Sequence, residues 1–116
     1  MSLIHYADAR MRVFDGEQAK GVTGRVLIGK QDGATHFCMR SFEIGPGGNT
    51  PRHTHPWEHE IFVHAGQAEI HINGDVFSAG PGTALYVAPH EEHQIKNVAG
   101  ETLIIVCLIP AGAPEL

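Results

Sequence analysis

Three histidines, His53, His55 and His59, lie within a seven-residue stretch, and a fourth, His93, follows much later in the chain. Imidazole is the commonest protein ligand of metal ions, and metal sites are usually built from a close pair of ligands plus remote ones. In an extended strand, residues two apart share a face and lie about 6.6 Å apart, so His53 and His55 could reach one ion. His59 lies four residues after His55, an even number, so it would face the same side of a continuing strand. The spacing predicts one divalent metal ion with these four histidines as candidate ligands.

Other residues near this stretch leave alternatives open. Glu58 and Glu60 could accept a hydrogen bond from a ligating imidazole, or could simply be solvated. Trp57 is either part of a pocket rim or a packing residue. Cys107 is expected in the core, and would be an oxidation-prone neighbour of the metal if it faced the interior. Arg40 and its counterpart Arg52 could meet an anionic substrate or could lie at the surface.

Short apolar or alternating runs predict the elements that must position these side chains. Turn signals separate them, such as "GPGG" at residues 45–48, and Asn73-Gly74 is a strong hairpin signal. Many short strands without a helical period predict an all-β, antiparallel sandwich or small barrel. The expected strands are residues 25–29, 36–44, 59–66, 68–73, 83–88, 93–98 and 102–109.

Composition narrows the class of protein further. A chain of 116 residues suits one domain, and 42% hydrophobic residues with 18% charged residues is typical of a folded globular chain. The formal net charge of −5 and the scattered basic residues argue against nucleic acid as a partner. Two cysteines without a CxxC spacing, and an N-terminus without a long apolar run, predict a cytoplasmic protein with no membrane segment.

The stretch from Gly47 to Gly66 resembles the first motif of the cupin superfamily, G(X)5HXH(X)3-4E(X)6G. His53 and His55 match its two histidines, and His59 stands where the family usually has a metal-binding glutamate. With the longer spacing Glu60 would be the ligand, but Gly66 would then follow five residues later instead of six. We favour His59, because strand alternation sends Glu60 to the opposite face.

A second stretch resembles the second cupin motif, G(X)5PXG(X)2H(X)3N. Gly82, His93 and Asn97 match it, whereas Ala88 and His90 replace the family's proline and glycine. The two motifs occur in the expected order, so the likeness covers roughly residues 25–110. Within the family, the chain looks most similar to small single-domain cupins that carry "HPWEHEIFV" and a four-histidine, manganese-type site.

This resemblance implies a jelly-roll barrel, an antiparallel double-stranded β-helix, over residues 25–110. Residues 1–24 would form an N-terminal arm or edge strand, and residues 111–116 a loose C-terminal tail. The family likeness implies a homodimer, for which an open sheet edge gives a physical motive. It also places Mn or Fe first as the bound ion, although imidazole ligands equally suit Zn, Ni and Cu.

Four neutral imidazoles cancel none of the charge of a divalent ion, which would stay strongly Lewis acidic. An octahedral ion would keep two open positions for a small-molecule substrate or ligand. The leading hypothesis is a dioxygenase-type oxidoreductase that acts on a small organic substrate. The alternatives are a non-redox isomerase or lyase of a sugar or keto acid, and a small-ligand-binding protein without catalysis. Cupin folds host all three, so the fold alone does not choose among them.

Overall fold

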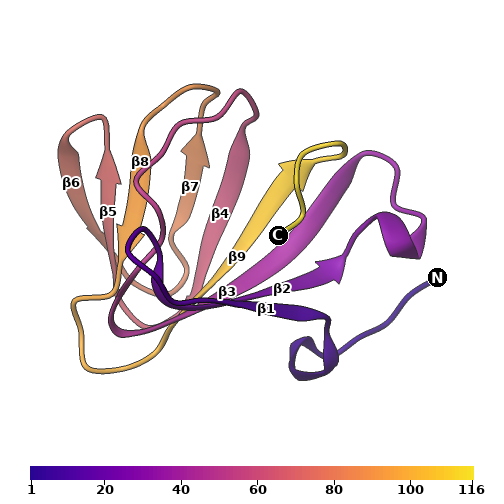
Figure 1. Cartoon of the computed structure of the whole chain (residues 1–116), viewed down its shortest axis with the longest axis horizontal. Helices are drawn as coiled ribbons and strands as arrows, with labels where there is room; N and C mark the ends of the chain where they lie inside the picture. The colour runs from indigo at the N-terminus through magenta and orange to yellow at the C-terminus, as the bar shows by residue number, and fades with distance from the viewer.

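Nine β-strands and two short 3-10 helices make up the computed structural model, which describes residues 1–116 (Figure 1). Neither helix has the length or the apolar character of a membrane-crossing segment. The elements are η1 (Tyr6–Asp8), β1 (Met11–Phe14), β2 (Lys20–Ile28), η2 (Lys30–Asp32), β3 (Phe37–Asn49), β4 (His59–Ala65), β5 (Ala68–Ile72), β6 (Asp75–Ala79), β7 (Ala84–Val87), β8 (His93–Lys96) and β9 (Leu103–Pro110).

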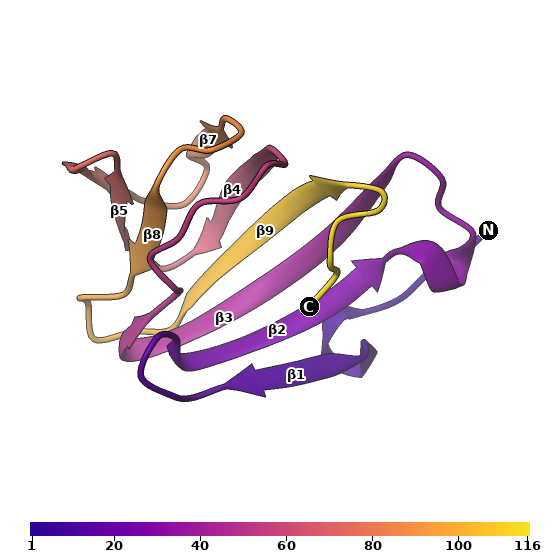
Figure 2. The ribbon, with the colours of Figure 1, turned by 45° about the horizontal axis from the view of Figure 1, so that its top comes forward.

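All strand pairs are antiparallel, and the sheet curls into a half-open barrel (Figures 1 and 2). The strand order is β6-β5-β8-β3-β9-β4-β7, while β2 also pairs with β3 and carries β1 at its edge. The predicted all-β antiparallel barrel is therefore confirmed. The sequence analysis placed the start of the barrel at residue 25, but β2 spans Lys20–Ile28 and crosses that boundary without a break. Pairing of two chains through an edge strand stays a prediction.

Alternating burial along β4 and β9 builds the wall of the barrel that faces the histidines. In β9, every second residue from Leu103 to Ile109 is buried. In β4, His59 and the two following odd-numbered residues are buried, whereas Glu60 is exposed. Because side chains in a strand point alternately to the two faces, His59 and Cys107 belong to the interior and Glu60 to the outside.

The hairpin between β5 and β6 confirms the turn predicted at Asn73-Gly74. Ile72 pairs with Asp75, and both turn residues have positive φ, +49° for Asn73 and +88° for Gly74. Positive φ at both central positions defines a two-residue turn whose twist matches that of the strands. The sequence did not predict β6 itself, because four of its five residues are exposed and it lacks a buried face.

The "GPGG" segment is not the turn that the sequence predicted, because residues 45–48 belong to β3. Ile44 pairs with Val22 and Asn49 pairs with Lys20, so four residues of β3 lie opposite the single residue Gly21. The extra residues form an irregular bulge, which bends a strand without ending it. The glycines of this segment therefore lie at a bend within β3 and not in a turn between two strands.

Asn97, the last residue of the second motif, fastens this bulge to the loop that precedes β9. Its side chain is only 1% exposed. Its Nδ2 donates hydrogen bonds to the main-chain oxygens of Ile44 (2.8 Å) and Glu101 (2.7 Å), and its Oδ1 accepts one from the Ala99 nitrogen (3.1 Å). The side chain thus satisfies three buried or partly buried main-chain groups at once.

Replacing Asn97 with alanine should lower the free energy of unfolding by about 2–3 kcal/mol, because buried main-chain groups lose their partners. Urea denaturation of the wild-type protein and the variant measures this difference. Lys96→Ala is the control, since the Lys96 side chain makes no hydrogen bond, and we expect little change there. Equal losses in the two variants would contradict the role assigned to Asn97.

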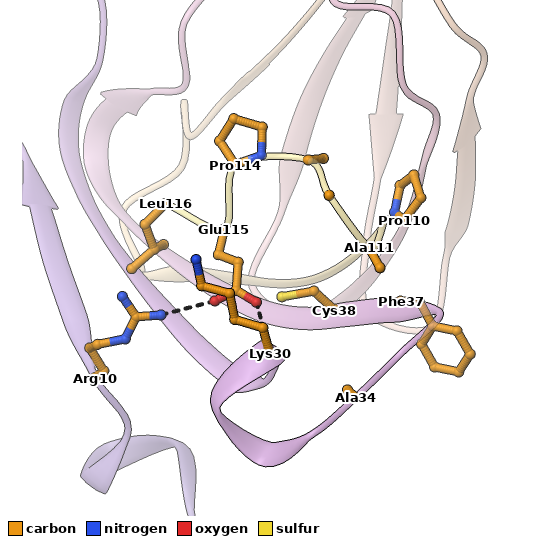
Figure 3. A pocket seen from close by; sticks show the side chains of 12 residues that line it. Arg10, Lys30, Ala34, Phe37, Cys38, Pro110, Ala111, Pro114, Glu115 and Leu116 are labelled. Atoms are coloured by element: carbon orange, nitrogen blue, oxygen red, sulfur yellow. Dashed lines mark hydrogen bonds and ion pairs between the residues drawn. The ribbon is translucent and has the colours of Figure 1, made fainter.

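The C-terminal segment does not form the loose tail expected from the sequence. Residues 111–116 turn back along the end of β9, and the Glu115 carboxylate accepts hydrogen bonds from Arg10 Nη2 (3.1 Å) and the Lys30 main-chain nitrogen (2.9 Å) (Figure 3). Leu116 packs against the hydrophobic core. The residues that hold this segment are remote in the sequence, which explains why composition alone suggested mobility.

Candidate metal centre

The four candidate histidines come from three parts of the barrel. His53 and His55 lie in the connection between β3 and β4, whereas His59 is the first residue of β4 and His93 the first of β8. His53 and His93 form an isolated antiparallel bridge, with two main-chain hydrogen bonds of 3.2 and 3.1 Å. The sequence argument treated His53 and His55 as strand residues, but this single bridge is the only β pairing there. The bridge holds the connection between β3 and β4 against β8.

The structure gathers the four imidazoles in two overlapping sets of three, one of His55, His59 and His93 and the other of His53, His55 and His93. His59 Nε2 lies 2.7 Å from His55 Nε2 and 3.0 Å from His93 Nε2. The His53 ring centroid lies 4.7 Å from that of His93 and 5.0 Å from that of His55. His55, His59 and His93 are buried, whereas His53 is exposed at the edge of the cluster. One ring nitrogen each from His53, His55 and His93 also lie within 4.8 Å of one another, a spacing that could hold an ion.

Hydrogen bonds on the far side of two rings determine which nitrogen faces the cluster. The Nδ1 of His55 lies 2.7 Å from the Trp57 carbonyl oxygen, and the Nδ1 of His93 lies 2.8 Å from that of Glu91. A carbonyl oxygen only accepts, so each Nδ1 must carry the hydrogen and donate it. In a neutral imidazole this leaves the Nε2 lone pair free and turned into the cluster.

This arrangement fits a divalent cation. Lone pairs of closely spaced nitrogens repel unless a proton or a metal ion lies between them. Two imidazole ligands at right angles, each about 2.1 Å from an ion, are about 3.0 Å apart. The distance from His59 Nε2 to His93 Nε2 has that value, and the distance to His55 Nε2 is slightly shorter. Carbonyl acceptors behind the rings are the usual support of ligating histidines.

Cys107 supports the third buried imidazole. Its Sγ lies 3.1 Å from His59 Nδ1 and also 3.0 Å from Arg40 Nη2, which donates to the sulfur. Burial raises the pKa of the Cys107 thiol above its ordinary value, and the Arg40 charge opposes that rise in part. Of the roles that the sequence left open for Cys107, the interior position beside the cluster is the one observed.

The two glutamates of the histidine-rich stretch lie away from the cluster. Glu60 is exposed on the outer face of β4, and Glu58 accepts a hydrogen bond from the Tyr86 hydroxyl. Trp57 does belong to the site, because its ring stacks on His55 with centroids 4.3 Å apart and planes only 7° from parallel. Neither of these two glutamates binds an imidazole nitrogen of the cluster.

A cavity of about 190 Å³ opens beside the cluster inside the barrel. Arg40, His53, His59 and His93 contribute its polar wall, and Cys107 lies among them. Its other walls are mostly apolar, formed by residues that include Phe14, Val22, Phe42, Ile61, Ile95 and Ile105. A larger hollow of about 380 Å³ lies beside the C-terminal segment, but no histidine lines it (Figure 3). Of these two hollows, the smaller one is the one that the histidine cluster lines.

For Arg40 the sequence left two roles open, contact with an anionic substrate or the surface position that is usual for a strand arginine. Here Arg40 is only 9% exposed and lines the cavity. Its partner in that hypothesis, Arg52, lies at the surface and pairs with Glu92 at 3.3 Å. Arg40 lies two residues after Cys38 on β3, so both side chains face the same side of the sheet, and Cys38 is buried. This spacing was the only sequence signal that could have marked Arg40 as buried and Arg52 as exposed.

The environment favours neutral imidazoles. Burial, and then the charges that His93 and His55 would carry, lowers the pKa of His59 to about 3. Partial desolvation beside the same cluster lowers the pKa of His53 to about 4. Both values lie far below the ordinary value of 6.5. Neutral rings are the form that binds a metal ion.

These pKa values predict how the stability of the metal-free protein depends on pH. An unfolded chain takes up protons on these histidines near pH 6.5, before the folded protein does. The contribution of these histidines to the free energy of unfolding should therefore be at its maximum above about pH 6.5 and fall steadily as the pH drops from 6.5 to 3. Urea denaturation across this range measures it, and His59→Gln should flatten the slope. Stability that rises as the pH falls would contradict the burial of neutral imidazoles.

A curled antiparallel barrel with an interior histidine cluster is the architecture of the cupins, and the comparisons agree. The cupin-domain family model Cupin_2 matches residues 40–109. The structure of the polyketide cyclase RemF from Streptomyces resistomycificus superposes with a TM-score of 0.89 at 33% identity, over 98% of this chain and 82% of that one. The chain belongs to the Cupin_2 family, as the two sequence motifs suggested.

Two curated relatives are more distant in sequence. The tetracenomycin polyketide synthase protein TcmJ of Streptomyces glaucescens is 26% identical over 96 residues, which are 82% of this chain and 64% of TcmJ. The 1-methylthio-D-xylulose 5-phosphate methylsulfurylase of Rhodospirillum rubrum is 26% identical over 73 residues, 63% of this chain and 47% of that enzyme. The chain thus spans less than two thirds of the length of either relative.

Proposed function

We propose that this cupin holds one divalent metal ion through His53, His55, His59 and His93 and acts on a small organic substrate in the adjacent cavity. The observation that carries the proposal is the convergence of ring nitrogens whose outer sides are fastened by hydrogen bonds. The bound ion would supply Lewis-acid polarisation of a carbonyl or enol oxygen. Mn or Fe stays the favoured ion, on the family resemblance alone.

The reaction that we propose is the cyclisation of a polycarbonyl, polyketide-type chain. In such a step a carbon next to a carbonyl loses a proton and attacks a second carbonyl carbon, whose oxygen gains a proton. The likeness to a polyketide cyclase and to a polyketide synthase protein supports this choice. It shares the non-redox character of the isomerase or lyase alternative but replaces the sugar or keto acid expected there, and it departs from the leading dioxygenase hypothesis.

The residues around the cavity suit that chemistry. Apolar side chains from β1, β2, β3, β4, β8 and β9 exclude water from most of its surface. Its volume of about 190 Å³ is below the range of about 300–1,000 Å³ typical of pockets that enclose a drug-sized ligand. We therefore propose that the reacting ring enters the cavity while the rest of the substrate extends outward past His53, the exposed member of the cluster.

The test uses a short synthetic poly-β-ketone with protein loaded separately with Mn or Zn. Mass spectrometry follows ring closure and loss of water, while an oxygen electrode follows consumption of dioxygen. We expect cyclised product without oxygen uptake, and no product above background with His93→Ala. Glu60→Gln, on the outer face, is the matched control and should retain activity. Substrate-dependent oxygen uptake would instead support the dioxygenase and reject cyclisation.

A further inference from the structure

Arg40 is a buried cation without a carboxylate partner. Its Nη1 donates to the Glu115 main-chain oxygen (3.2 Å) and its Nη2 to Cys107 Sγ (3.0 Å), whereas the buried Nε has no hydrogen-bond partner. The guanidinium also lies over the Phe42 ring, 4.9 Å from its centroid. No carboxylate forms an ion pair with Arg40. A buried charge of this kind is costly unless an opposite charge meets it.

The nearest candidate for that opposite charge is already engaged. The Glu115 carboxylate binds Arg10 and the Lys30 main-chain nitrogen (Figure 3), and it forms no ion pair with Arg40. Only the main-chain oxygen of Glu115 reaches Arg40. The chain as a whole carries a formal net charge of −5, yet this cavity has a guanidinium and no acidic side chain. Its polar wall is therefore suited to an anion.

We propose that Arg40 and the histidine cluster form a two-point site for an oxyanion, an enolate or a carboxylate, carried by a planar, ring-sized and otherwise apolar molecule. Arg40 and the histidines line one cavity, so a single small molecule can meet both. A guanidinium offers directed N–H donors that suit planar oxyanions. The inference rests on the proposed function only for its second contact, because the Arg40 contact needs no metal ion.

Calorimetric titration of the purified protein, before and after dialysis against a chelator, tests this site. Two probe pairs differ mainly in charge: benzoate with benzamide, and the ionised enol of 1,3-cyclohexanedione with its neutral enol ether, 3-methoxycyclohex-2-enone. We expect the metal-free wild-type protein to bind at least one anion about tenfold or more tightly than its neutral partner. The pair that shows the preference identifies carboxylate or enolate as the recognised group.

Arg40→Met should abolish that preference, whereas Arg25→Met should keep it. Arg25 is the matched control, a half-buried strand arginine that pairs with Glu43 and does not line the cavity. If Arg40→Met fails to fold, Arg40→Lys decides, because it keeps the charge without the planar set of donors and should bind the anion more weakly than the wild type. Circular dichroism verifies folding of each variant.

Equal affinity for anion and neutral partner in the metal-free wild-type protein would overturn the site, as would equal losses in Arg40→Met and Arg25→Met. Anion binding that requires the metal and ignores Arg40 would also reject it. Failure of the proposed function looks different, since cyclisation would then be absent while Arg40-dependent binding in metal-free protein persists.

Discussion

Replacing His93 with alanine is expected to lower the affinity for a divalent metal ion by about 100-fold or more. The His93 ring is buried, its Nδ1 is held by the Glu91 carbonyl, and its Nε2 lies 3.0 Å from that of His59. Loss of a residue that merely supports a ligand typically costs 10–100-fold, and loss of a ligand should exceed that. Competition with a chromophoric chelator measures the affinity of metal-free protein.

The same measurement should rank the four histidines. His53 is exposed and its ring makes no hydrogen bond, so it is the least fixed member and His53→Ala should cost less than His93→Ala. His64 is the control, because it is exposed on the outer face of β4. An unchanged affinity in His93→Ala, or an equal loss in His64→Ala, would contradict the assignment of the site.

Replacing Gly66 with alanine is expected to destabilise the fold by about 3 kcal/mol or more. Gly66 has φ +84°, and a Cβ there would lie 2.5 Å from the Thr102 main-chain oxygen and 2.8 Å from the Leu103 Cα. A left-handed conformation alone costs a residue with a side chain about 1–2 kcal/mol. The contact with main-chain atoms adds strain that no rotamer change can relieve. Urea denaturation provides the measurement.

Gly74→Ala separates the two causes. Gly74 has φ +88°, close to that of Gly66, but nothing lies within 4 Å of a Cβ at that position. It should cost only the conformational part, about 1–2 kcal/mol. Equal losses in the two variants would show that the approach of Gly66 to β9 contributes nothing. The final glycine of the first motif would then need only its backbone freedom.

The sequence predicted most of the strands because their physical basis is local. β4 and β9 each bury every second residue, and this alternation is visible in one dimension. The histidine spacing was informative as well, because His55 lies against both His53 and His59, although His53 and His55 belong to a connection and not to a strand. The fourth candidate ligand, His93, lies far away in the chain, and its match to the second cupin motif was what identified it.

The surroundings of the histidines could not be predicted, because they depend on pairing between distant strands. Arg40 pairs with Cys107 across β3 and β9, and Cys107 also pairs with Ile61 of β4. Only this three-strand register places a guanidinium and a thiol behind His59. The position of Glu115 has the same origin, since its partners lie 105 and 85 residues away in the chain.

A crystal structure of the metal-loaded protein, with anomalous scattering measured at the metal edge, tests the central claim most directly. We predict one anomalous peak in the cavity, within about 2.0–2.3 Å of ring nitrogens from His53, His55, His59 and His93. Absence of a peak from the cluster, or a peak bound by three of these histidines and the Glu60 carboxylate, would contradict the four-histidine site.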